Sequence, residues 1–333
     1  MKTVICDNLW QEKWDEFLLQ NSPNGGFLQS WAWGEFQNEL GKKIYRIAVI
    51  DDSENIKILS QLITYNLPFG KKYFYVPRGP VAQDVASQEF KILIKEIKRI
   101  AFKKGAIFVR IDPPLLDGQE TKNILKNLGL NFVGEVEPKS TLILNLKNND
   151  NEILAGFKSK TRYNIKVAQK NNITIEEGKE YFEDFWNLMQ KTAKRDKIKI
   201  HSKKHYQKMV DILSKEKILK LMVAKFEDKV IAANLNIIFG KWCVYLHGSS
   251  DYDFRDKMAT YLLQWESILL AKSRWCDYYD FGGASETKWA GITRFKRGFV
   301  PEGEFTVHIG AFDIPINGFW YLMYKILKRK RFK

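Results

Sequence analysis

Apolar and polar residues alternate along two stretches near the start of the chain, and this alternation predicts a β-hairpin. Residues 42–50 (KKIYRIAVI) and 55–67 (NIKILSQLITYNL) have the period of two that a strand with one buried face requires. The polar residues DDSEN between them predict the turn. Further strands are predicted at residues 71–81, 106–114 and 140–146, and helices at 87–105 and 120–134. The first 148 residues are therefore predicted to be α+β.

The second half of the chain repeats this order of elements. Helices are predicted at residues 181–196, 203–216 and 258–275, a meander of three strands at 218–250, and a strand ending in a glycine turn at 276–283. Antiparallel strands followed by a helix and another strand are typical of an N-acyltransferase domain of the GNAT type.

GNAT domains normally hold the pyrophosphate of coenzyme A on the backbone N–H groups of a [QR]-x-x-G-x-[GA] motif. No glycine of this chain has Gln or Arg three residues before it, so we expect neither a coenzyme A thioester donor nor another cofactor. The motifs of P-loop, dinucleotide-binding and α/β-hydrolase proteins are also missing from the sequence, which argues against those three chemistries.

A run of cations between residues 153 and 175 contains no acidic residue. On one continuous helix its apolar residues would share one face, and its cations would form a stripe on the other. The apolar residues are Ile153, Leu154, Phe157, Ile165 and Ala168, and the stripe consists of Lys158, Arg162, Lys166 and Lys170, with Lys160 nearby. An exposed helix usually mixes Glu with Lys, so the missing acid favours an anionic ligand over the alternative of a solvated surface helix.

Composition predicts a globular protein of two domains, with 333 residues, 45% hydrophobic and 14% aromatic. The net charge of +15 favours nucleic acid, phosphorylated metabolites or an anionic membrane as partner, although a lysine-rich sequence also follows from genomic base composition. The C-terminal segment NGFWYLMYKILKRKRFK suggests peripheral contact with an anionic membrane. Its cations are Lys325, Lys328, Arg329, Lys330, Arg331 and Lys333, whereas Phe319, Trp320 and Leu322 could instead pack on the first domain.

The cysteines and histidines predict neither disulfides nor a metal site. Cys6, Cys243 and Cys276 are widely spaced, which fits a reducing cytoplasm. His201 and His205 stand four apart without an intervening Glu or an evident third ligand. The N-terminus becomes acidic too soon for a signal peptide, and no apolar run approaches the length that spans a bilayer. We expect a cytoplasmic protein, peripheral to the inner face of the plasma membrane if the tail binds lipid.

An ordered set of short segments resembles the Fem peptidyltransferases (FemABX) of bacterial cell-wall synthesis. The segments are FLQSWAWGEFQ, YVPRGPV, RIDPP, FKSKTRYNIKVAQKNNITI, TAKRD, YLHGSS, YLLQWESILLAK, YYDFGGAS and FKRGF. The resemblance implies an α+β fold of two GNAT-like domains, each a mixed, mostly antiparallel sheet flanked by helices. The first, on the wall-precursor acceptor side, would comprise residues 1–148 plus 305–333; the second, on the aminoacyl-tRNA side, residues 149–304. The chain resembles the compact subgroup, without a helical hairpin near TAKRD.

The resemblance also implies an aminoacyltransferase that acts as a monomer. It would move an amino acid of the Gly, Ala or Ser type from aminoacyl-tRNA to the side-chain amine of the peptidoglycan stem peptide, on lipid II or UDP-MurNAc-pentapeptide. The alternatives are a GNAT-like N-acyltransferase with another activated donor and a basic RNA-binding protein without catalysis. The sequence shows none of the usual RNP, KH or helix-turn-helix signatures.

The resemblance assigns the chemistry to three residues. An aminoacyl ester is already activated, so the enzyme needs positioning and charge stabilisation more than a covalent nucleophile. Phe295 and Lys296 match the family's Phe-Lys pair, whose ammonium would face the oxyanion; the alternative is a strand with an ordinary surface lysine. Asp112 would hold or deprotonate the attacking amine, whose pKa of about 10.4 leaves little free base, or would merely cap the turn before Pro113.

The other candidates follow the family pattern less closely. Acceptor-binding residues would be Trp33, Gln37, Arg78, His201, His205, Tyr206 and Tyr245, although a core position is an equal alternative for Tyr245. Lys158, Lys160, Arg162, Lys166 and Lys170 would contact tRNA. Where compact relatives have a lysine this chain has Glu35 or Gln37, and where they have Arg and Tyr it has His201 and His205. These departures leave the form of the acceptor open.

Overall fold

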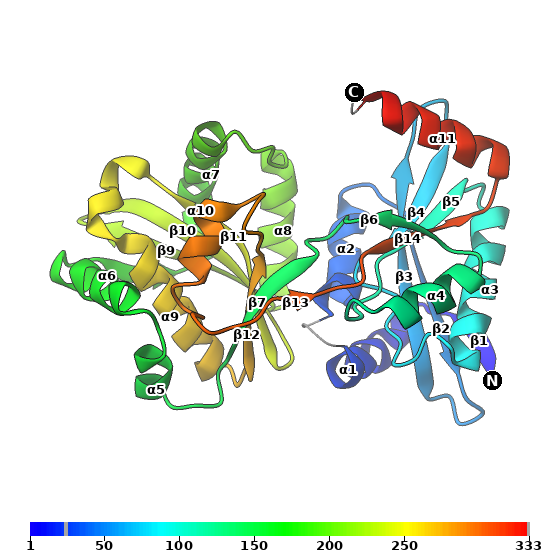
Figure 1. Ribbon diagram of the computed structural model, residues 1–333, viewed down its shortest axis with the longest axis horizontal. Coiled ribbons are helices and arrows are strands. Elements are labelled where there is room, and N and C mark those ends of the chain that lie inside the picture. Colours follow the sequence, from blue (N-terminus) through cyan, green and yellow to red (C-terminus); the bar gives the residue numbers. More distant parts are fainter. Residues whose placement is uncertain (23–25, 332–333) are drawn as a thin grey trace. The chain divides into compact units, whose positions relative to one another are not determined.

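The computed structural model describes residues 1–22 and 26–331, with side chains up to Lys328. Lys333 of the predicted basic tail lies outside the described residues, as do the side chains of Arg329, Lys330 and Arg331. Contacts divide the chain into two compact units, Met1–Lys139 with Val307–Lys333 (unit 1) and Ser140–Thr306 (unit 2). In the described part of the chain each unit has a mixed sheet of seven strands flanked by helices, which confirms the α+β class (Figure 1).

Both unit boundaries differ from the predicted ones, after residue 148 and before residue 305. Strand β7 (Ser140–Asn145) belongs to unit 2, because it pairs antiparallel with β12 (Tyr278–Gly283). The short strand β13 (Thr306–Val307) extends the same sheet beyond β7. The chain therefore leaves unit 1 before β7 and re-enters it after β13.

The sheet of unit 1 has the order β1-β2-β3-β4-β5-β14-β6. Its strands are β1 (Lys2–Ile5), β2 (Ile44–Ile50), β3 (Ile56–Asn66), β4 (Lys72–Val76), β5 (Phe108–Ile111), β6 (Asn131–Gly134) and β14 (Ala311–Pro315). The predicted hairpin is β2 and β3, paired antiparallel. Helices α1 (Gln11–Asn21) and α2 (Trp31–Glu39) lie on one face of the sheet and α3 (Gln88–Lys103) on the other (Figure 1).

Helix α3 forms as its sequence predicts and connects the parallel strands β4 and β5. Ser87 caps its start by accepting a hydrogen bond from the backbone N–H of Phe90. Its apolar face packs into the main core of unit 1 through Phe90, Leu93, Ile94 and Ile97. Because β4 and β5 are parallel, their carboxyl ends and the loops that follow lie at the same end of the sheet.

The prediction of one helix over residues 120–134 is wrong. Helix α4 (Gln119–Asn127) ends where Gly129 takes a φ of 81°, and residues 131–134 then form β6. β14 lies between β5 and β6 and pairs antiparallel with both. The C-terminal segment therefore completes the first sheet, and helix α11 (Gly318–Arg331) follows it.

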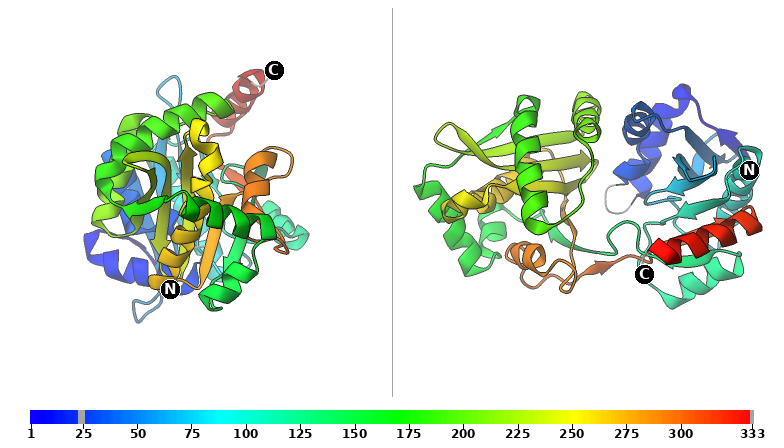
Figure 2. Two further views of the ribbon diagram at one scale, coloured as in Figure 1. Left: turned by 90° about the vertical axis from the view of Figure 1, so that its left-hand side faces the viewer. Right: turned by 90° about the horizontal axis from the view of Figure 1, so that it is seen from above.

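A single helix over the basic run is also wrong. Helix α5 (Asp150–Ala155) ends at Gly156, and helix α6 (Ser159–Lys170) begins after Lys158. The α6 helix packs against α9 (Ala259–Ser273) through Ile165 and Ala168 (Figure 2). Ile153 and Leu154 therefore belong to a different helix from the cationic stripe.

The sheet of unit 2 has the order β13-β7-β12-β11-β10-β9-β8. The remaining elements are β8 (Thr174–Glu177), α7 (Phe182–Asp196), α8 (Lys203–Lys215), β9 (Leu219–Phe226), β10 (Lys229–Phe239), β11 (Trp242–Ser250) and α10 (Ala290–Lys296). β9, β10 and β11 form the predicted meander. The parallel register of β11 with β12 covers only residues 242–244 of β11, although β11 continues to Ser250. The two strands therefore part beyond Val244.

The buried ion pair of Arg110 and Asp313 suggests a stability test for unit 1. The guanidinium of Arg110 donates to both carboxylate oxygens of Asp313 at 2.7 and 2.9 Å, and Asp313 is 1% exposed. Asp313→Ala would leave a buried cation unpaired, a change that typically costs about 3–5 kcal/mol. We expect a clear fall in the urea midpoint, whereas Arg99→Ala, which breaks an exposed pair with Glu96, should hardly move it. Equal midpoints for the two variants would contradict this role of Asp313.

Candidate functional site

Lys296 and Phe295 are the last two residues of helix α10. The alternative of a surface lysine on a strand is therefore wrong, because Lys296 lies on a helix. Only 5% of its surface is exposed. Its Nζ donates a hydrogen bond to the carbonyl of Gly283, at the end of β12, over 2.7 Å. The Nζ atom also lies 5.6 Å from the ring centroid of Tyr245 on β11. Residues from α10, β11 and β12 thus surround one ammonium.

Burial lowers the pKa of Lys296 to about 8, and the charge of Asp280 acts in the opposite direction. Asp280 lies on β12, 6% exposed, and accepts a hydrogen bond from the backbone N–H of Gly282 at 2.7 Å and another from the hydroxyl of Thr141. An ammonium has three N–H donors, of which the bond to Gly283 uses one. The arrangement can therefore stabilise a negative charge that forms beside Lys296.

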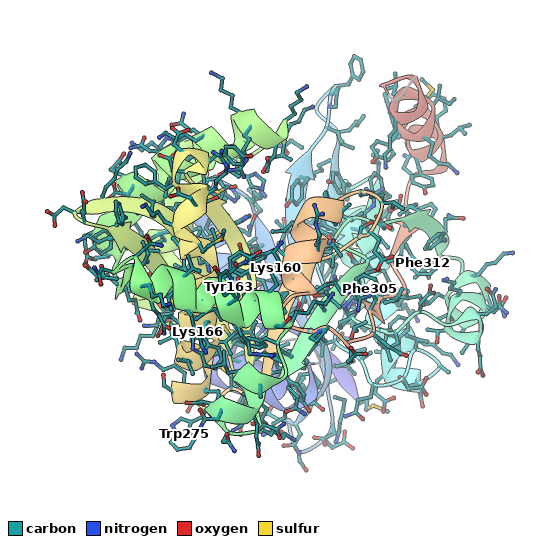
Figure 3. All side chains as sticks on the ribbon, turned by 60° about the vertical axis from the view of Figure 1, so that its left-hand side comes forward. Lys160, Tyr163, Lys166, Trp275, Phe305 and Phe312 are labelled. Carbon is teal, nitrogen blue, oxygen red and sulfur yellow. The ribbon has the colours of Figure 1, made fainter. Side chains whose placement is uncertain are left out.

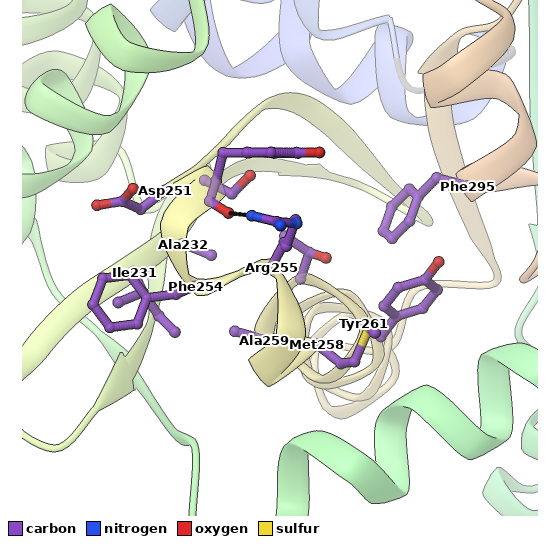
Figure 4. Close-up of a pocket in the computed structure, with 12 residues that line it drawn as sticks. Ile231, Ala232, Asp251, Phe254, Arg255, Met258, Ala259, Tyr261 and Phe295 are labelled. Carbon is purple, nitrogen blue, oxygen red and sulfur yellow. Dashed lines mark hydrogen bonds between the residues drawn. The ribbon is translucent and has the colours of Figure 1, made fainter. Parts of the chain in front are cut away.

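A pocket of about 210 Å³ lies next to Phe295, at the N-terminal end of α9 (Figure 4). The rings of Phe295 and Tyr261 lie on the same side of it, with centroids 5.1 Å apart. Arg255 contributes a guanidinium that lies 4.5 Å from the ring of Tyr252 and donates to the carbonyl of Tyr252 at 3.3 Å. Aromatic walls and a cation beside a helix N-terminus suit an aromatic, anionic ligand.

Sequence reasoning missed Tyr252, Arg255 and Tyr261. Tyr252 and Arg255 lie between strand β11 and helix α9, and Tyr261 lies in the first turn of α9. A GNAT domain holds the coenzyme pyrophosphate at such a helix start. The segment DYDFRDKMATY contains no glycine motif, so its sequence did not mark it as a binding segment. Its position between a predicted strand and a predicted helix was the available clue.

Tyr245 lies next to a β-bulge in β11. The register with β10 shifts between Leu235, opposite His247, and Asn236, opposite Tyr245, so Leu246 is the extra residue. Burial raises the pKa of Tyr245, which keeps its hydroxyl protonated. A Cβ atom on Gly248 would overlap that hydroxyl oxygen, so the glycine leaves room for the side chain. Tyr245 is half-buried and has both the core contacts of the alternative and the contact with Lys296.

Asp112 and Arg78 form the second site, in unit 1, at the carboxyl ends of β5 and β4. Burial raises the pKa of Asp112 to about 6; Arg78 lowers it and Glu137 raises it. Asp112 is 1% exposed, and its Oδ2 accepts from the backbone N–H of Glu137 at 3.1 Å, so its bond does not go to the turn before Pro113. Asp112 Oδ1 and Arg78 Nη1 lie 3.7 Å apart, and neither has a hydrogen-bond partner among the described residues. Polar atoms so placed can bind a ligand.

A lysine that sequence reasoning missed lies near this pair. Lys42 Nζ donates to the side chain of Gln37 at 2.6 Å and lies 4.0 Å from the ring centroid of Tyr65. Burial lowers the pKa of Lys42 to about 8. Tyr65 packs against Tyr75, whose hydroxyl donates to Glu137 at 2.8 Å. The cluster thus connects Lys42 to the Asp112 site, at a distance in sequence that no local motif reveals.

The comparisons with known proteins identify the family of this chain. Residues 9–229 and 219–329 match the FemAB family. The chain belongs to the FemAB family. It is 23% identical to a lipid II:glycine glycyltransferase of Staphylococcus epidermidis, over 97% of this chain and 95% of the relative. The Staphylococcus haemolyticus protein of the same name is 25% identical, over 93% of this chain and 92% of the relative. The predicted enzyme class, a Fem-type transferase, is thereby confirmed.

Solved structures confirm the GNAT-like fold. A crystal structure of FemX superposes with a TM-score of 0.86 at 22% identity, over 97% of this chain and 99% of the other. A tandem GNAT protein from the clavulanic acid biosynthesis pathway gives a TM-score of 0.59 at 9% identity. At these identities the likeness concerns the fold alone.

The remaining acceptor candidates of this FemAB protein fall into two groups. His201 is exposed and His205 is half-buried, and their rings stack with centroids 3.9 Å apart. Tyr206 is 1% exposed and packs in the core against Phe185 and His247. Burial lowers the pKa of His247 to about 4, and His201 adds to the effect. Within the described residues no group of three or more His, Cys, Asp or Glu side chains could hold a metal ion.

Trp33 and Gln37 are buried on α2, and Glu35 is paired with Arg46. Trp33 is 9% exposed and packs edge-on against Phe27 and Phe36. Gln37 is 3% exposed and contributes through its bond to Lys42. Glu35 accepts from Arg46 at 2.8 Å. The cation beside Gln37 is therefore Lys42, which follows α2 in the sequence.

The cationic stripe on α6 is narrower than its sequence predicts. Arg162 is half-buried and donates to the carbonyls of Ala155, at 3.0 Å, and Phe157, which ties the end of α5 to α6. The exposed cations are Lys158, Lys160, Lys166 and Lys170. Figure 3 shows Lys160, Tyr163 and Lys166 along α6, and Tyr163 is 66% exposed between them. An exposed tyrosine among lysines is suited to single-stranded nucleic acid, whose bases can stack on it.

Proposed function

We propose that this protein transfers an amino acid from aminoacyl-tRNA to the side-chain amine of a peptidoglycan precursor. The observation that carries the proposal is the buried ammonium of Lys296, whose neighbour in sequence, Phe295, lines the aromatic pocket at the start of α9. The family adds its support, since the named relatives are lipid II:glycine glycyltransferases. We therefore propose lipid II as acceptor and a small amino acid, glycine in the first instance, as the group transferred. A lipid-linked acceptor would bring the protein to the inner face of the membrane.

The proposed reaction requires charge stabilisation at one atom. The precursor amine attacks the ester carbonyl carbon, forming a C–N bond and an oxyanion that Lys296 would neutralise. When the oxyanion collapses, the bond to the ribose oxygen breaks, the ribose oxygen takes up a proton and the amine nitrogen loses one. Asp112 would hold the amine or accept that proton, because its pKa near 6 leaves it ionised at neutral pH. Phe295 and Tyr261 would support the ester by packing.

The donor would bind along unit 2. We propose that the pocket holds the 3′-terminal nucleotide, with the base against Phe295 and Tyr261 and a phosphate near Arg255. The exposed lysines of α6 would contact tRNA phosphates, and Tyr163 would lie against an unpaired base of the tRNA. On the acceptor side, Arg78 and Lys42 of unit 1 offer cations for the diphosphate of the precursor.

Lys296→Met tests the catalytic assignment. The substitution keeps the length and apolar stem of the side chain and removes its charge, so kcat should fall by a factor of about 10² to 10³. Affinity for tRNA should change only a few-fold, and thermal stability hardly at all. Mass spectrometry of lipid II after incubation with charged tRNA measures the product. Lys288→Met, in the preceding segment, is the control and should keep most activity.

Two results would count against the proposal. Normal turnover by the Lys296→Met variant would remove the lysine from the mechanism. Binding of charged tRNA by the wild-type protein without any modified precursor would favour the RNA-binding alternative.

The pH dependence of kcat/KM should be bell-shaped. Asp112, with its pKa raised to about 6, loses its proton as the pH rises through 6, so activity that needs the carboxylate increases there. Lys296, with its pKa lowered to about 8, loses its proton as the pH rises through 8, so activity that needs the ammonium decreases there. The residual activity of Asp112→Asn should lack the acid limb and that of Lys296→Arg the basic limb. If both limbs of the pH profile are unchanged in the two variants, they arise from the titration of groups other than Asp112 and Lys296.

The α6 lysines should determine tRNA affinity without supporting the fold. Replacing Lys158, Lys160 and Lys166 by Glu should weaken tRNA binding and flatten its dependence on salt. The complex would then have fewer phosphate contacts and would release fewer counterions when it forms. The variant should melt like the wild-type protein. Arg162→Ala, by contrast, should lower the melting temperature, since its guanidinium binds the carbonyls at the end of α5. If the dependence of tRNA affinity on salt is unchanged in the triple variant, α6 is a solvated surface helix that makes no tRNA contacts.

A further inference from the structure

Helix α11 is anchored to unit 1 by one side only. Tyr321 is 6% exposed, lies 5.5 Å from the ring centroid of Phe108, and donates its hydroxyl proton to Asp313 at 3.1 Å. Tyr324 packs on Phe108 at 4.7 Å. Trp320 is half-buried beside these residues. Of Phe319, Trp320 and Leu322, which could pack on the first domain, only Trp320 does so, because Phe319 and Leu322 are 67% and 57% exposed.

The outer side of α11 is a continuous apolar stripe. Its members are spaced three and four residues apart and are Phe319 (67% exposed), Leu322 (57%), Met323 (37%), Ile326 (41%) and Leu327 (47%). Figures 1 and 2 show α11 on the outside of unit 1. Single exposed apolar residues are ordinary, but a contiguous set of this kind usually marks an interaction surface.

The neighbouring β3–β4 turn extends this surface. Phe69 is 80% exposed at the tip of the turn, where its φ is 60°. Lys71 places its Nζ 4.2 Å from the ring centroid of Trp320, which connects the turn to the first part of α11. We call Phe69 and the five outer residues of α11 the apolar face.

Charge identifies the kind of partner. Lys71, Lys72, Lys325 and Lys328 lie on the same two segments, and the sequence has no acidic residue after Asp313 and none between residues 65 and 73. Two copies of this face would bring like charges together, so self-association is disfavoured. An apolar stripe with cations beside it fits an anionic lipid surface, where each cation adds to the attraction and the apolar side chains enter the headgroup region.

We propose that the apolar face inserts shallowly into anionic phospholipid bilayers, with α11 lying along the surface. A helix of 14 residues is about 21 Å long, shorter than the hydrocarbon core of about 30 Å. None of the described helices meets the criteria for a membrane span. The proposal rests on the proposed use of lipid II as acceptor. An enzyme docked on the membrane would meet a lipid-linked acceptor by diffusing along the membrane surface.

Vesicle co-sedimentation of the full-length protein tests docking directly. The wild-type protein should sediment with vesicles of equal parts phosphatidylglycerol and phosphatidylcholine, and less with pure phosphatidylcholine or at high salt. Replacing Phe319, Leu322 and Ile326 by Ser should reduce binding at least tenfold. Phe102→Ser is the matched control, because Phe102 is 77% exposed elsewhere in unit 1, and it should bind normally. Circular dichroism should show both variants folded.

A second assay separates this proposal from the proposed function. The triple-Ser variant should keep its transfer activity on water-soluble UDP-MurNAc-pentapeptide or on detergent-solubilised lipid II, and lose it on lipid II in anionic vesicles. Vesicle binding that the triple variant leaves unchanged, or a wild-type dimer that the variant dissociates, would overturn membrane docking. Vesicle binding without any transfer would support docking and count against the transferase proposal alone.

Discussion

The ion pair between Arg110 and Asp313 closes the first sheet of the protein. β14 enters between β5 and β6 after the chain has built all of unit 2, and Asp313 fixes it with two hydrogen bonds to Arg110. The hydroxyl of Tyr321 reaches the same carboxylate, so the ion pair also anchors α11. Asp112 follows β5 directly, and its backbone N–H binds the carbonyls of Val76 and Gly79. One buried charge pair thus supports the strand that carries the candidate base and the helix that carries the apolar face.

Unit 2 depends on an interrupted strand pair. β11 and β12 stay in parallel register over residues 242–244 of β11 and then part, while a bulge at Leu246 changes the direction of the following residues. The separation leaves the carbonyl of Gly283 to bind the Lys296 ammonium. A GNAT domain uses the same region for coenzyme A, but this chain has aromatic rings and Arg255 where the glycine motif would stand. The residues of this segment therefore suit a different ligand from the coenzyme A that a glycine motif would hold.

Periodicity predicted most elements because their apolar faces are buried continuously. Helix α3 and the strand pair β2 and β3 are examples, and each packs its predicted apolar side chains into one core. Periodicity failed where a backbone change lies inside the pattern, as at Gly129 before β6 and at Lys158, whose extended backbone separates α5 from α6. The burial of Lys296 and the contact of Lys42 with Tyr65 depend on tertiary packing, which no local pattern encodes. The resemblance located Lys296, and the structure supplied its environment.

The return of the chain into unit 1 also has a consequence for synthesis on the ribosome. Unit 2 is continuous in sequence, so all its residues emerge before β14, which unit 1 still lacks at that moment. Until β14 arrives, β5 and β6 have strand edges with unpaired N–H and C=O groups, which are prone to wrong pairing. Folding of the nascent chain therefore runs against the usual order, in which N-terminal domains finish first. Residues 311–315, which leave the ribosome after the whole of unit 2, therefore decide whether the first sheet is completed.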